Sequence, residues 1–348
     1  MSYTNGLDKP SDYFNTKLYT GTEVSGNSIA GVGFEPDFIW IKNRTDVSNH
    51  NLYDSVRGGN GTSHYFLKSN LLNAEGTNTS ALLTIDSDGF TLGDGNEVNG
   101  SGDNMVSWNW LASNTTASNT DGSITSTVSA NTTSGFSIVS WSGTGSNGTI
   151  GHGLGDTPSL MIIKNRNNIG EWRVWNSTFN ADQYLYLNRT DAVATQSTLF
   201  NSTLPTSSVI SVGTSGDINS SGRTYIAYCF AEKKGFSKFG SYTGNGSTDG
   251  TFVYTGFKPA FVTLKVSSTT GDWQTYDNKR AGYNDANYRL KPSTNEAEVT
   301  TSPIDILSNG FKVRASGGSF NGSGNTYIYM AFASNPFVTS TGIPTTAR

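Results

Sequence analysis

Two acidic residues in matching sequence contexts are the best candidates for chemistry in this chain. Asp54 lies in the segment YDSVR and Asp277 lies in YDNKR. A glycosidase needs two carboxylates that flank a cleft, whereas an aspartate closely followed by arginine commonly caps a turn or forms an ion pair. A third, similar segment has Asn176 at this position. We therefore predict structural roles for both acids, and a polysaccharide depolymerase is a remote alternative.

Metal and nucleophile chemistry find little support in the sequence. The histidines His50, His64 and His152 do not recur at matching positions, and we expect them to be exposed and without a catalytic role. The segments 86–89 and 94–97 cluster oxygen atoms that a hard cation could use, but the full calcium-loop spacing is absent. We predict no catalytic, cofactor-binding or metal-binding residues, and whether these loops bind calcium stays open.

Aromatic residues are the more informative surface candidates. The chain has 7 Trp, 16 Tyr and 18 Phe among many polar neighbours, so we expect some rings to be exposed. The pairs Trp172/Trp175 and Trp273/Tyr276 are examples, and such rings could stack on sugars or anchor a protein interface. Because the two pairs occupy matching places in similar segments, they indicate architecture before ligand binding.

The composition is that of a turn-rich β protein. Hydrophobic residues make up 34% and charged residues 14% of the chain, with 40 glycines and 9 prolines. A net charge of −4 without a basic stripe argues against nucleic acid as a partner. The single Cys229 excludes an internal disulfide. No apolar run approaches the roughly 20 residues that span a membrane, and the N-terminus shows no export signal. We expect a soluble protein made in a cytoplasm.

Three landmarks recur in the same order three times, which predicts three related β-sandwich modules, jelly-roll-like or otherwise. Each copy has a proline-led apolar strand with a lysine (GFEPDFIWIKNR, GLGDTPSLMIIKNR and GFKPAFVTLK), an aromatic residue seventeen positions past the proline, and a closing strand after an Asn-x-Ser-Gly turn. Modules 2 and 3 abut, while module 1 stands apart. The predicted divisions are a docking tail (1–13), β module 1 (14–113), a polar linker with one weak strand (114–134), β module 2 (135–232), β module 3 (235–334) and a C-terminal tail (335–348).

Period-two patterning predicts which faces of the strands are buried. Each proline-led strand is apolar on both faces, so we expect cover on both sides, by an opposing sheet and by another module, a loop or a partner. Each closing strand carries large apolar residues on one face. This predicted core ladder comprises Val106, Trp108, Trp110, Ile226, Tyr228, Phe230, Ile328, Met330 and Phe332.

The repeated segments resemble a β domain of unknown function that is common in virion proteins of marine tailed phages of the cyanophage and pelagiphage type. The resemblance rests on GFEPDFIWIKNR, YDSVRGG, SDGFTLG and VNGSGDNMVSWNW, and later on SKFGSYTGNGSTDGTFVYTGFKPAFV and SGNTYIYMAFASNPF. It covers almost the whole chain and brings no catalytic residues. It implies a virion component that is synthesised in the host cytoplasm and displayed on the particle exterior.

Within that resemblance we expect a non-enzymatic structural protein, with a slight preference for a capsid decoration or head appendage. No heptad repeat, collagen repeat or β-helical shaft supports a long fibre. The alternative is a tail-fibre or receptor-binding protein that recognises a host-surface glycan through loops and exposed aromatics. Expected partners are other virion proteins and a homo-oligomer, with a trimer as the guess. The expected docking contacts lie in the two tails, at Tyr3, Tyr13, Phe14, Pro336 and Phe337.

Overall fold

The fold is built almost entirely from short antiparallel strands. The structure is a computed structural model that describes residues 6–282 and 284–345, without the side chains of residues 302 and 303. The described chain holds two four-residue helices and one 3-10 turn, η1 (Pro10–Asp12), beside its strands. The predicted all-β class is confirmed. No helix among the described residues is long and apolar enough to cross a membrane.

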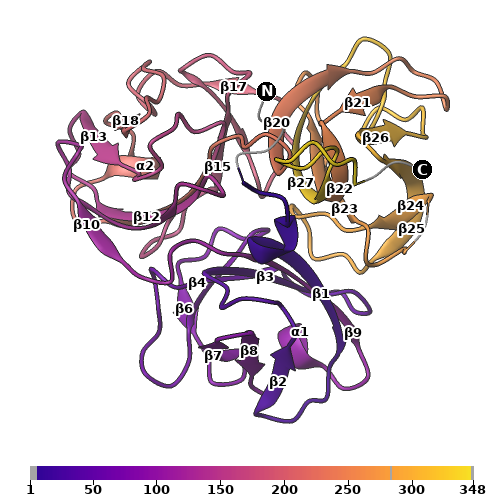
Figure 1. Cartoon of the computed structure of the whole chain (residues 1–348). Helices are drawn as coiled ribbons and strands as arrows, with labels where there is room; N and C mark the ends of the chain where they lie inside the picture. The colour runs from indigo at the N-terminus through magenta and orange to yellow at the C-terminus, as the bar shows by residue number, and fades with distance from the viewer. Residues whose placement is uncertain (1–5, 283, 346–348) are drawn as a thin grey trace.

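The strands form three lobes around a common centre, as Figure 1 shows. Each of the six sheets draws its strands from one lobe, so each lobe has an inner sheet and an outer sheet that packs on it. The inner sheet has more strands than the outer sheet in lobes 1 and 2, and the two are equal in lobe 3. Lobe 1 holds β1 to β9, lobe 2 holds β10 to β19 and lobe 3 holds β20 to β27.

In lobe 1 the six-stranded inner sheet faces a three-stranded outer sheet. Helix α1 (Asn96–Asn99) precedes the closing strand β9. The inner order is β1 (Phe14–Thr20), β9 (Asn104–Trp110), β3 (Phe38–Asn43), β4 (Asn51–Asp54), β5 (Tyr65–Lys68) and β6 (Gly76–Thr77), and the outer order is β2 (Asn27–Ala30), β8 (Gly89–Leu92) and β7 (Leu82–Asp86).

Lobe 2 has the largest sheet of the molecule. Helix α2 (Gly216–Asn219) takes the place of α1 before the closing strand β19. The eight-stranded order is β10 (Ala117–Asn119), β11 (Ser126–Asn131), β12 (Phe136–Ser142), β19 (Thr224–Phe230), β14 (Leu160–Asn165), β15 (Arg173–Asn176), β16 (Gln183–Tyr186) and β17 (Ala194–Thr195), and the outer pair is β13 (Gly148–Gly151) with β18 (Val209–Val212).

Lobe 3 has two four-stranded sheets. The inner order is β20 (Ser237–Thr243), β27 (Thr326–Pro336), β22 (Phe257–Val266) and β23 (Trp273–Asp277), and the outer order is β21 (Phe252–Tyr254), β26 (Gly310–Val313), β25 (Val299–Leu307) and β24 (Ala286–Arg289).

Each closing strand separates two cores, because side chains alternate across a strand. In β19 the residues Tyr225, Ala227 and Cys229 face the core between the two sheets of lobe 2. The alternate residues of β9, β19 and β27, which are the nine ladder residues, belong to one cluster shared by all three lobes. There Trp110 lies 5.6 Å from Phe332 and 6.4 Å from Phe230, measured between ring centroids. The ladders are therefore the contact surface between lobes.

The proline-led strands β3 and β14 are buried along their whole length. One face of β3 (Ile39 and Ile41) packs in the core of lobe 1, and the other (Phe38 and Trp40) packs in the shared cluster. Both faces are apolar because each covers a different core.

The segment 114–134, predicted as a polar linker with one weak strand, holds two strands and is part of lobe 2. Strands β10 and β11 extend the sheet of lobe 2, and β11 pairs with β12 from Ser126↔Trp141 to Asn131↔Phe136. Ladder hydrogen bonds hold these polar residues, and only Ile124 and Val128 contribute to the core. Lobe 1 does not stand apart either, since its Trp110 and Phe14 lie in the shared cluster.

Most of the predicted docking contacts face inward. Phe14 stacks on Phe332 at 5.1 Å, and Tyr13 makes an edge contact with Phe236 at 6.0 Å. Pro336 is the buried end of β27. Phe337 is 39% exposed, and Tyr3 lies outside the described residues. The chain ends contain apolar residues because those residues complete the protein's own centre; Leu7 is fully buried there as well.

Candidate functional site

Asp54 is buried in an ion pair at the contact of lobes 1 and 2. Its Oδ2 accepts from Nε of Arg57 at 2.5 Å, and its Oδ1 accepts from the backbone N–H of Arg57 at 2.7 Å. The hydroxyl of Tyr228, from lobe 2, donates to the same carboxylate at 2.8 Å. Both side chains of the ion pair are fully buried. A carboxylate held by these donors caps its own turn and anchors a neighbouring lobe.

Asp277 repeats this arrangement at the contact of lobes 3 and 1. It accepts from Nε of Arg280 at 2.6 Å and from the indole N–H of Trp108, in lobe 1, at 3.0 Å. Trp108 and Tyr228 occupy the same rung of the ladder in their closing strands. The two acids therefore serve two different lobe contacts, and neither lies in a paired-carboxylate cleft.

The third position of this set, in lobe 2, lacks both the arginine partner and the donor from a neighbouring lobe. Asn176 stands where the other lobes have aspartate, and the matching rung of lobe 3 is Met330, which has no hydrogen-bond donor. The Nδ2 of Asn176 is buried without a hydrogen-bond partner among the described residues. An aspartate in place of Asn176 would therefore receive no hydrogen bond from the side chain of Met330.

A second set of contacts recurs cyclically around the molecule. These contacts are bonds from a backbone N–H to a backbone carbonyl of another lobe: from Glu75 to Arg166 at 2.7 Å, from Glu298 to Arg44 at 2.9 Å, and from Val193 to Ser267 at 2.8 Å. These bonds join lobe 1 to 2, lobe 3 to 1 and lobe 2 to 3. The three lobes therefore meet in one cyclic order, through equivalent positions.

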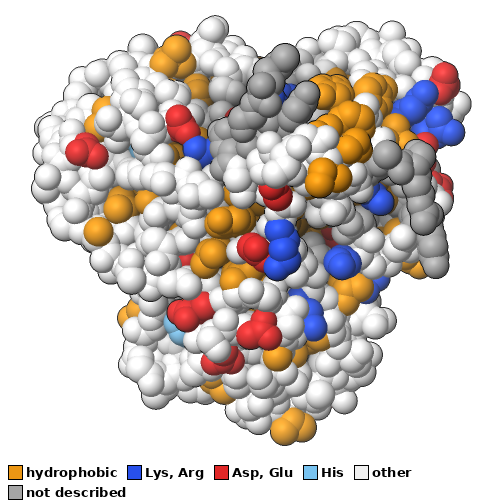
Figure 2. Space-filling model, in the orientation of Figure 1, with side chains coloured by type: hydrophobic (Ala, Val, Ile, Leu, Met, Phe, Trp, Pro, Cys, Tyr) orange, Lys and Arg blue, Asp and Glu red, His pale blue; other side chains and the backbone are white. Residues whose placement is uncertain are grey.

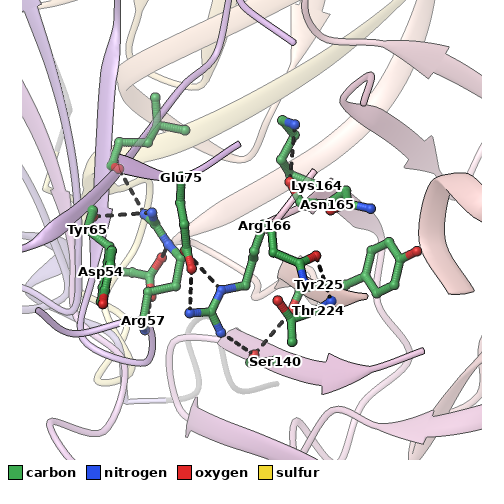
Figure 3. A network of polar contacts seen from close by, with 12 residues as sticks. Asp54, Arg57, Tyr65, Glu75, Ser140, Lys164, Asn165, Arg166, Thr224 and Tyr225 are labelled. Carbon is green, nitrogen blue, oxygen red and sulfur yellow. Dashed lines mark hydrogen bonds and ion pairs between the residues drawn. The ribbon is translucent and has the colours of Figure 1, made fainter. Parts of the chain in front are cut away.

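Side-chain ion pairs reinforce two of these three contacts. Arg166 binds Glu75 through two bonds of 3.0 Å and also donates to the hydroxyl of Ser140 at 2.9 Å (Figure 3). Arg44 binds Glu298 through bonds of 3.0 and 2.6 Å. At the contact of lobes 2 and 3 these two positions are Val193 and Ser267, so the pair of positions keeps its backbone bond but has no ion pair.

The lysine of each proline-led strand is buried, and Lys164 and Lys265 bind across a lobe contact. Nζ of Lys164 donates to the Leu72 carbonyl of lobe 1 at 2.9 Å, and Nζ of Lys265 donates to the Thr190 carbonyl of lobe 2 at 3.1 Å. Burial lowers the pKa of Lys42, Lys164 and Lys265 to about 8, because the charged form loses its hydration. At Lys164 and Lys265, backbone carbonyls of the neighbouring lobe replace part of that water, whereas Lys42 donates to the Asn43 and Asp46 carbonyls of its own lobe.

The expectation of exposed histidines is wrong, because His50 and His152 are fully buried and His64 is half-buried. His50 lies fourteen residues past its proline, where lobes 2 and 3 have Trp172 and Trp273. Its Nδ1 accepts from the indole of Trp40 at 2.9 Å. Burial, and next the charge of Lys42, hold the pKa of His50 well below its usual range.

The aromatic residues suggested as exposed are also buried. Trp172 donates through Nε1 to the Lys68 carbonyl of lobe 1 at 2.9 Å, and Trp273 donates to the Tyr186 carbonyl of lobe 2 at 2.7 Å. Trp175 and Tyr276 lie in the cores of lobes 2 and 3. An indole carries a large apolar area and one donor, which suits a lobe contact.

The repeated Asn-x-Ser-Gly landmark is a buried clamp. Asn99, Asn219 and Asn321 are fully buried. Each accepts a backbone N–H from the turn after the opening strand, at 2.9 Å from Thr22, 2.9 Å from Thr144 and 3.0 Å from Asn245. The sequence showed the repeat but not its partner, which lies more than seventy residues earlier.

The two Asx-rich segments are used by turns and ion pairs. Asp88 accepts from the N–H groups of Gly31 and Gly33, at 3.0 and 2.6 Å. Glu97 pairs with Lys68 at 2.7 Å. No group of three or more potential metal ligands occurs among the described residues.

Asp37 is a structural residue that no sequence pattern singled out. Its buried carboxylate accepts from the N–H of Ala112 at 2.7 Å and from the hydroxyl of Ser55 at 2.5 Å. Desolvation raises the pKa of Asp37 above its usual value, against these donors. Lobes 2 and 3 have Ser159 and Ala260 at this position, so no repeat exposed it.

The outer surface concentrates apolar side chains on lobe 3. Figure 2 shows hydrophobic side chains gathered over the region of β20, β21 and β27. Phe252, Tyr254 and Phe337 are 43%, 57% and 39% exposed. A groove of about 180 Å³ runs beside them, with Tyr254, Gly256, Phe337 and Val338 in its lining. This surface is the best binding candidate in the described chain.

The chain belongs to the family described as domain of unknown function (DUF7483), whose model matches residues 9–336. The match runs from η1 to the end of β27, so the family's unit is the whole three-lobed body. A comparison with curated protein sequences finds no match.

Proposed function

We propose that this chain is a non-enzymatic structural protein of a tailed-phage virion, displayed on the particle exterior. The observation that carries the proposal is the use of the repeated polar residues. Asp54, Asp277 and the Arg–Glu pairs are all engaged in turns and lobe contacts. What the molecule presents outward is a polar surface with few charges, which suits a surface component. The phage assignment itself rests on the sequence resemblance.

Within that proposal, a capsid decoration or head appendage fits the shape best. The cyclic backbone contacts of Glu75, Val193 and Glu298 make one chain into a body with three equivalent sides. A three-sided body matches the three-fold positions of a capsid lattice. In this proposal a single chain supplies the three sides that a homotrimer was expected to supply.

The second candidate, a tail-fibre or receptor-binding protein, is favoured by the exposed aromatics of lobe 3. Phe252 and Tyr254 are solvent-exposed rings of the kind that stack on sugars. The remote depolymerase alternative has lost its two candidate acids, because Asp54 and Asp277 are each held by arginine.

Immunogold labelling of particles tests the proposal directly. An antibody against the purified chain should label intact virions, and a head-surface pattern supports decoration. Labelling confined to the tail tip, together with saturable binding of the purified chain to host cells, supports the receptor-binding alternative. Absence of the chain from purified particles would contradict both.

A further inference from the structure

The three lobes differ in what covers the edge strand of the outer sheet. The edge strands are β2, β13 and β21, and their central residues Ile29, Ile150 and Val253 pair with Phe90, Ile210 and Phe311. The two flanking residues of each strand point away from the core. They are Ser28 and Ala30 in lobe 1, Thr149 and Gly151 in lobe 2, and Phe252 and Tyr254 in lobe 3.

In lobe 2 the chain itself covers this edge. The N–H of Ile124 donates to the carbonyl of Thr149 at 2.9 Å, and the N–H of Thr149 donates to the hydroxyl of Ser123 at 2.9 Å. Ser126 donates to the carbonyl of Gly151 at 2.7 Å, and Ile124 forms a parallel bridge with Ile150. An extended segment with one buried aliphatic side chain therefore completes the edge.

In lobe 3 the same edge is open. Strand β21 is the first strand of its sheet and pairs on one side, with β26. The N–H of Val313 donates to the carbonyl of Thr251, and residues of an antiparallel strand bond alternately to one side and the other. The backbone N–H and C=O groups of Phe252 and Tyr254 therefore point away from β26, toward the open edge. No bond from another described segment reaches those groups. The groove with Phe337 and Val338 continues from the end of the strand.

The side chains distinguish this edge from that of lobe 1. Ser28 and Ala30 are small and add little contact area, whereas Phe252 and Tyr254 are large, exposed and on the same side of the strand. Proteins usually protect a bare edge with charge or cover. An edge flanked by two aromatic rings is instead suited to strand addition, in which backbone bonds give affinity and side chains give selectivity.

We infer that β21 binds an extended segment of a partner polypeptide by strand addition, with an aliphatic side chain of that segment beside Val253, as Ile124 lies beside Ile150 in lobe 2, and its neighbouring side chains against the rings of Phe252 and Tyr254. The residues 123–126 that complete β13 in lobe 2 show the chemistry of the occupant, which is an extended segment with an aliphatic residue among small hydroxyl residues. The inference holds wherever the protein is located, and it goes beyond the proposed virion role.

Selection from a display library of random twelve-residue peptides tests this inference on the full chain. Peptides are selected on the wild type with counter-selection on the F252S/Y254A double variant, which installs the residues of lobe 1. V47S is the matched control, because Val47 is an exposed apolar residue of lobe 1 at 70% exposure. Thermal unfolding checks that both variants keep the fold.

Fluorescence anisotropy of the selected peptides then measures affinity. We expect enriched peptides to contain aliphatic residues at alternate positions and to bind F252S/Y254A about tenfold or more weakly, with unchanged affinity for V47S. N-methylation of the peptide backbone at alternate residues should weaken binding by a similar factor, since it removes ladder donors. Failure to enrich any peptide, equal binding to both proteins, or insensitivity to N-methylation would each overturn the inference.

Discussion

The contact of lobes 1 and 2 and the contact of lobes 2 and 3 use the same positions with different chemistry. The first has the buried Asp54–Arg57 pair with Tyr228 and the outer Glu75–Arg166 pair. The second has Asn176, Met330, Val193 and Ser267 at the matching places. Both keep the equivalent backbone bond and the shared apolar cluster. Apolar packing therefore joins the lobes, and the polar pairs add to two contacts of the three.

The largest expected effect comes from the shared cluster. Trp110→Ala removes a fully buried indole that contacts rings from all three lobes (Phe14, Phe230 and Phe332), so we expect a loss of about 4–5 kcal/mol in the free energy of unfolding. Denaturant unfolding monitored by fluorescence and circular dichroism measures it. Phe252→Ala, on the surface, is the control and should change stability by less than about 0.5 kcal/mol. Independent melting of lobe 1 in the Trp110 variant, with lobes 2 and 3 unaffected, would contradict a shared centre.

Replacing a buried acid should distinguish a lobe contact that contains an ion pair from the contact that has asparagine at the same position. Asp54→Asn leaves the fully buried Arg57 without its carboxylate partner, which should cost about 3 kcal/mol. Asn176→Ala, at the matching position of lobe 2, loses only neutral hydrogen bonds and should cost about 1 kcal/mol. Equilibrium unfolding of the two variants gives the difference. Equal costs would mean that the ion pair adds nothing to its contact.

The buried lysines predict a pH dependence with a definite sign. Their pKa falls from 10.5 in the unfolded chain to about 8 in the folded protein. Between these values the unfolded chain binds more protons, so stability rises with pH; below about pH 8 both states are protonated and the cost of burial is fully present. Each lysine should contribute a rise of about 1.5 kcal/mol at most from pH 8 to about pH 9.5.

Comparing the wild type with Lys265→Met separates the contribution of this lysine to the pH dependence of stability from the contributions of other titrating groups. The variant should show a smaller increase in the free energy of unfolding over the same pH range, whatever its absolute stability. An identical pH slope in both proteins would show that Lys265 keeps an ordinary pKa when folded.

The smallest expected effect comes from building the missing outer pair. The double variant V193E/S267R copies Glu75–Arg166 into the contact of lobes 2 and 3. Both existing pairs are partly exposed, so we expect a coupling energy of about 1 kcal/mol or less, reduced by salt. A double-mutant cycle with the two single variants measures it. A coupling of zero would indicate that the geometry of this contact differs from that of the other two.

The sequence predicted the strands and the ladder well, because burial imposes a period of two on residues such as Val106, Trp108 and Trp110. It could not show that this ladder faces a neighbouring lobe, since apolar residues look alike in either core. The one weak strand predicted in residues 114–134 overlaps β11, but its membership in the sheet of lobe 2 was missed, because hydrogen bonds hold its polar residues. His50 appeared isolated because its matching residues are Trp172 and Trp273, which differ in type but share a place at the lobe contacts.

The candidate site was less predictable than the fold. The exposure of Phe252 and Tyr254 depends on which edge the chain covers, and residues 123–126 cover that of lobe 2 alone. Phe252 and Tyr254 alternate with the buried Val253, which is the pattern of any half-buried strand. Only the three-dimensional arrangement separates an open edge from a covered one.

Native-state hydrogen exchange tests most directly whether the three lobes form one body around a shared centre. Amides of β9, β19 and β27 should exchange with the same free energy of opening, equal to that of global unfolding, because their ladders pack in one cluster. A closing strand of one lobe that opens several kcal/mol more easily than the other two would contradict this account.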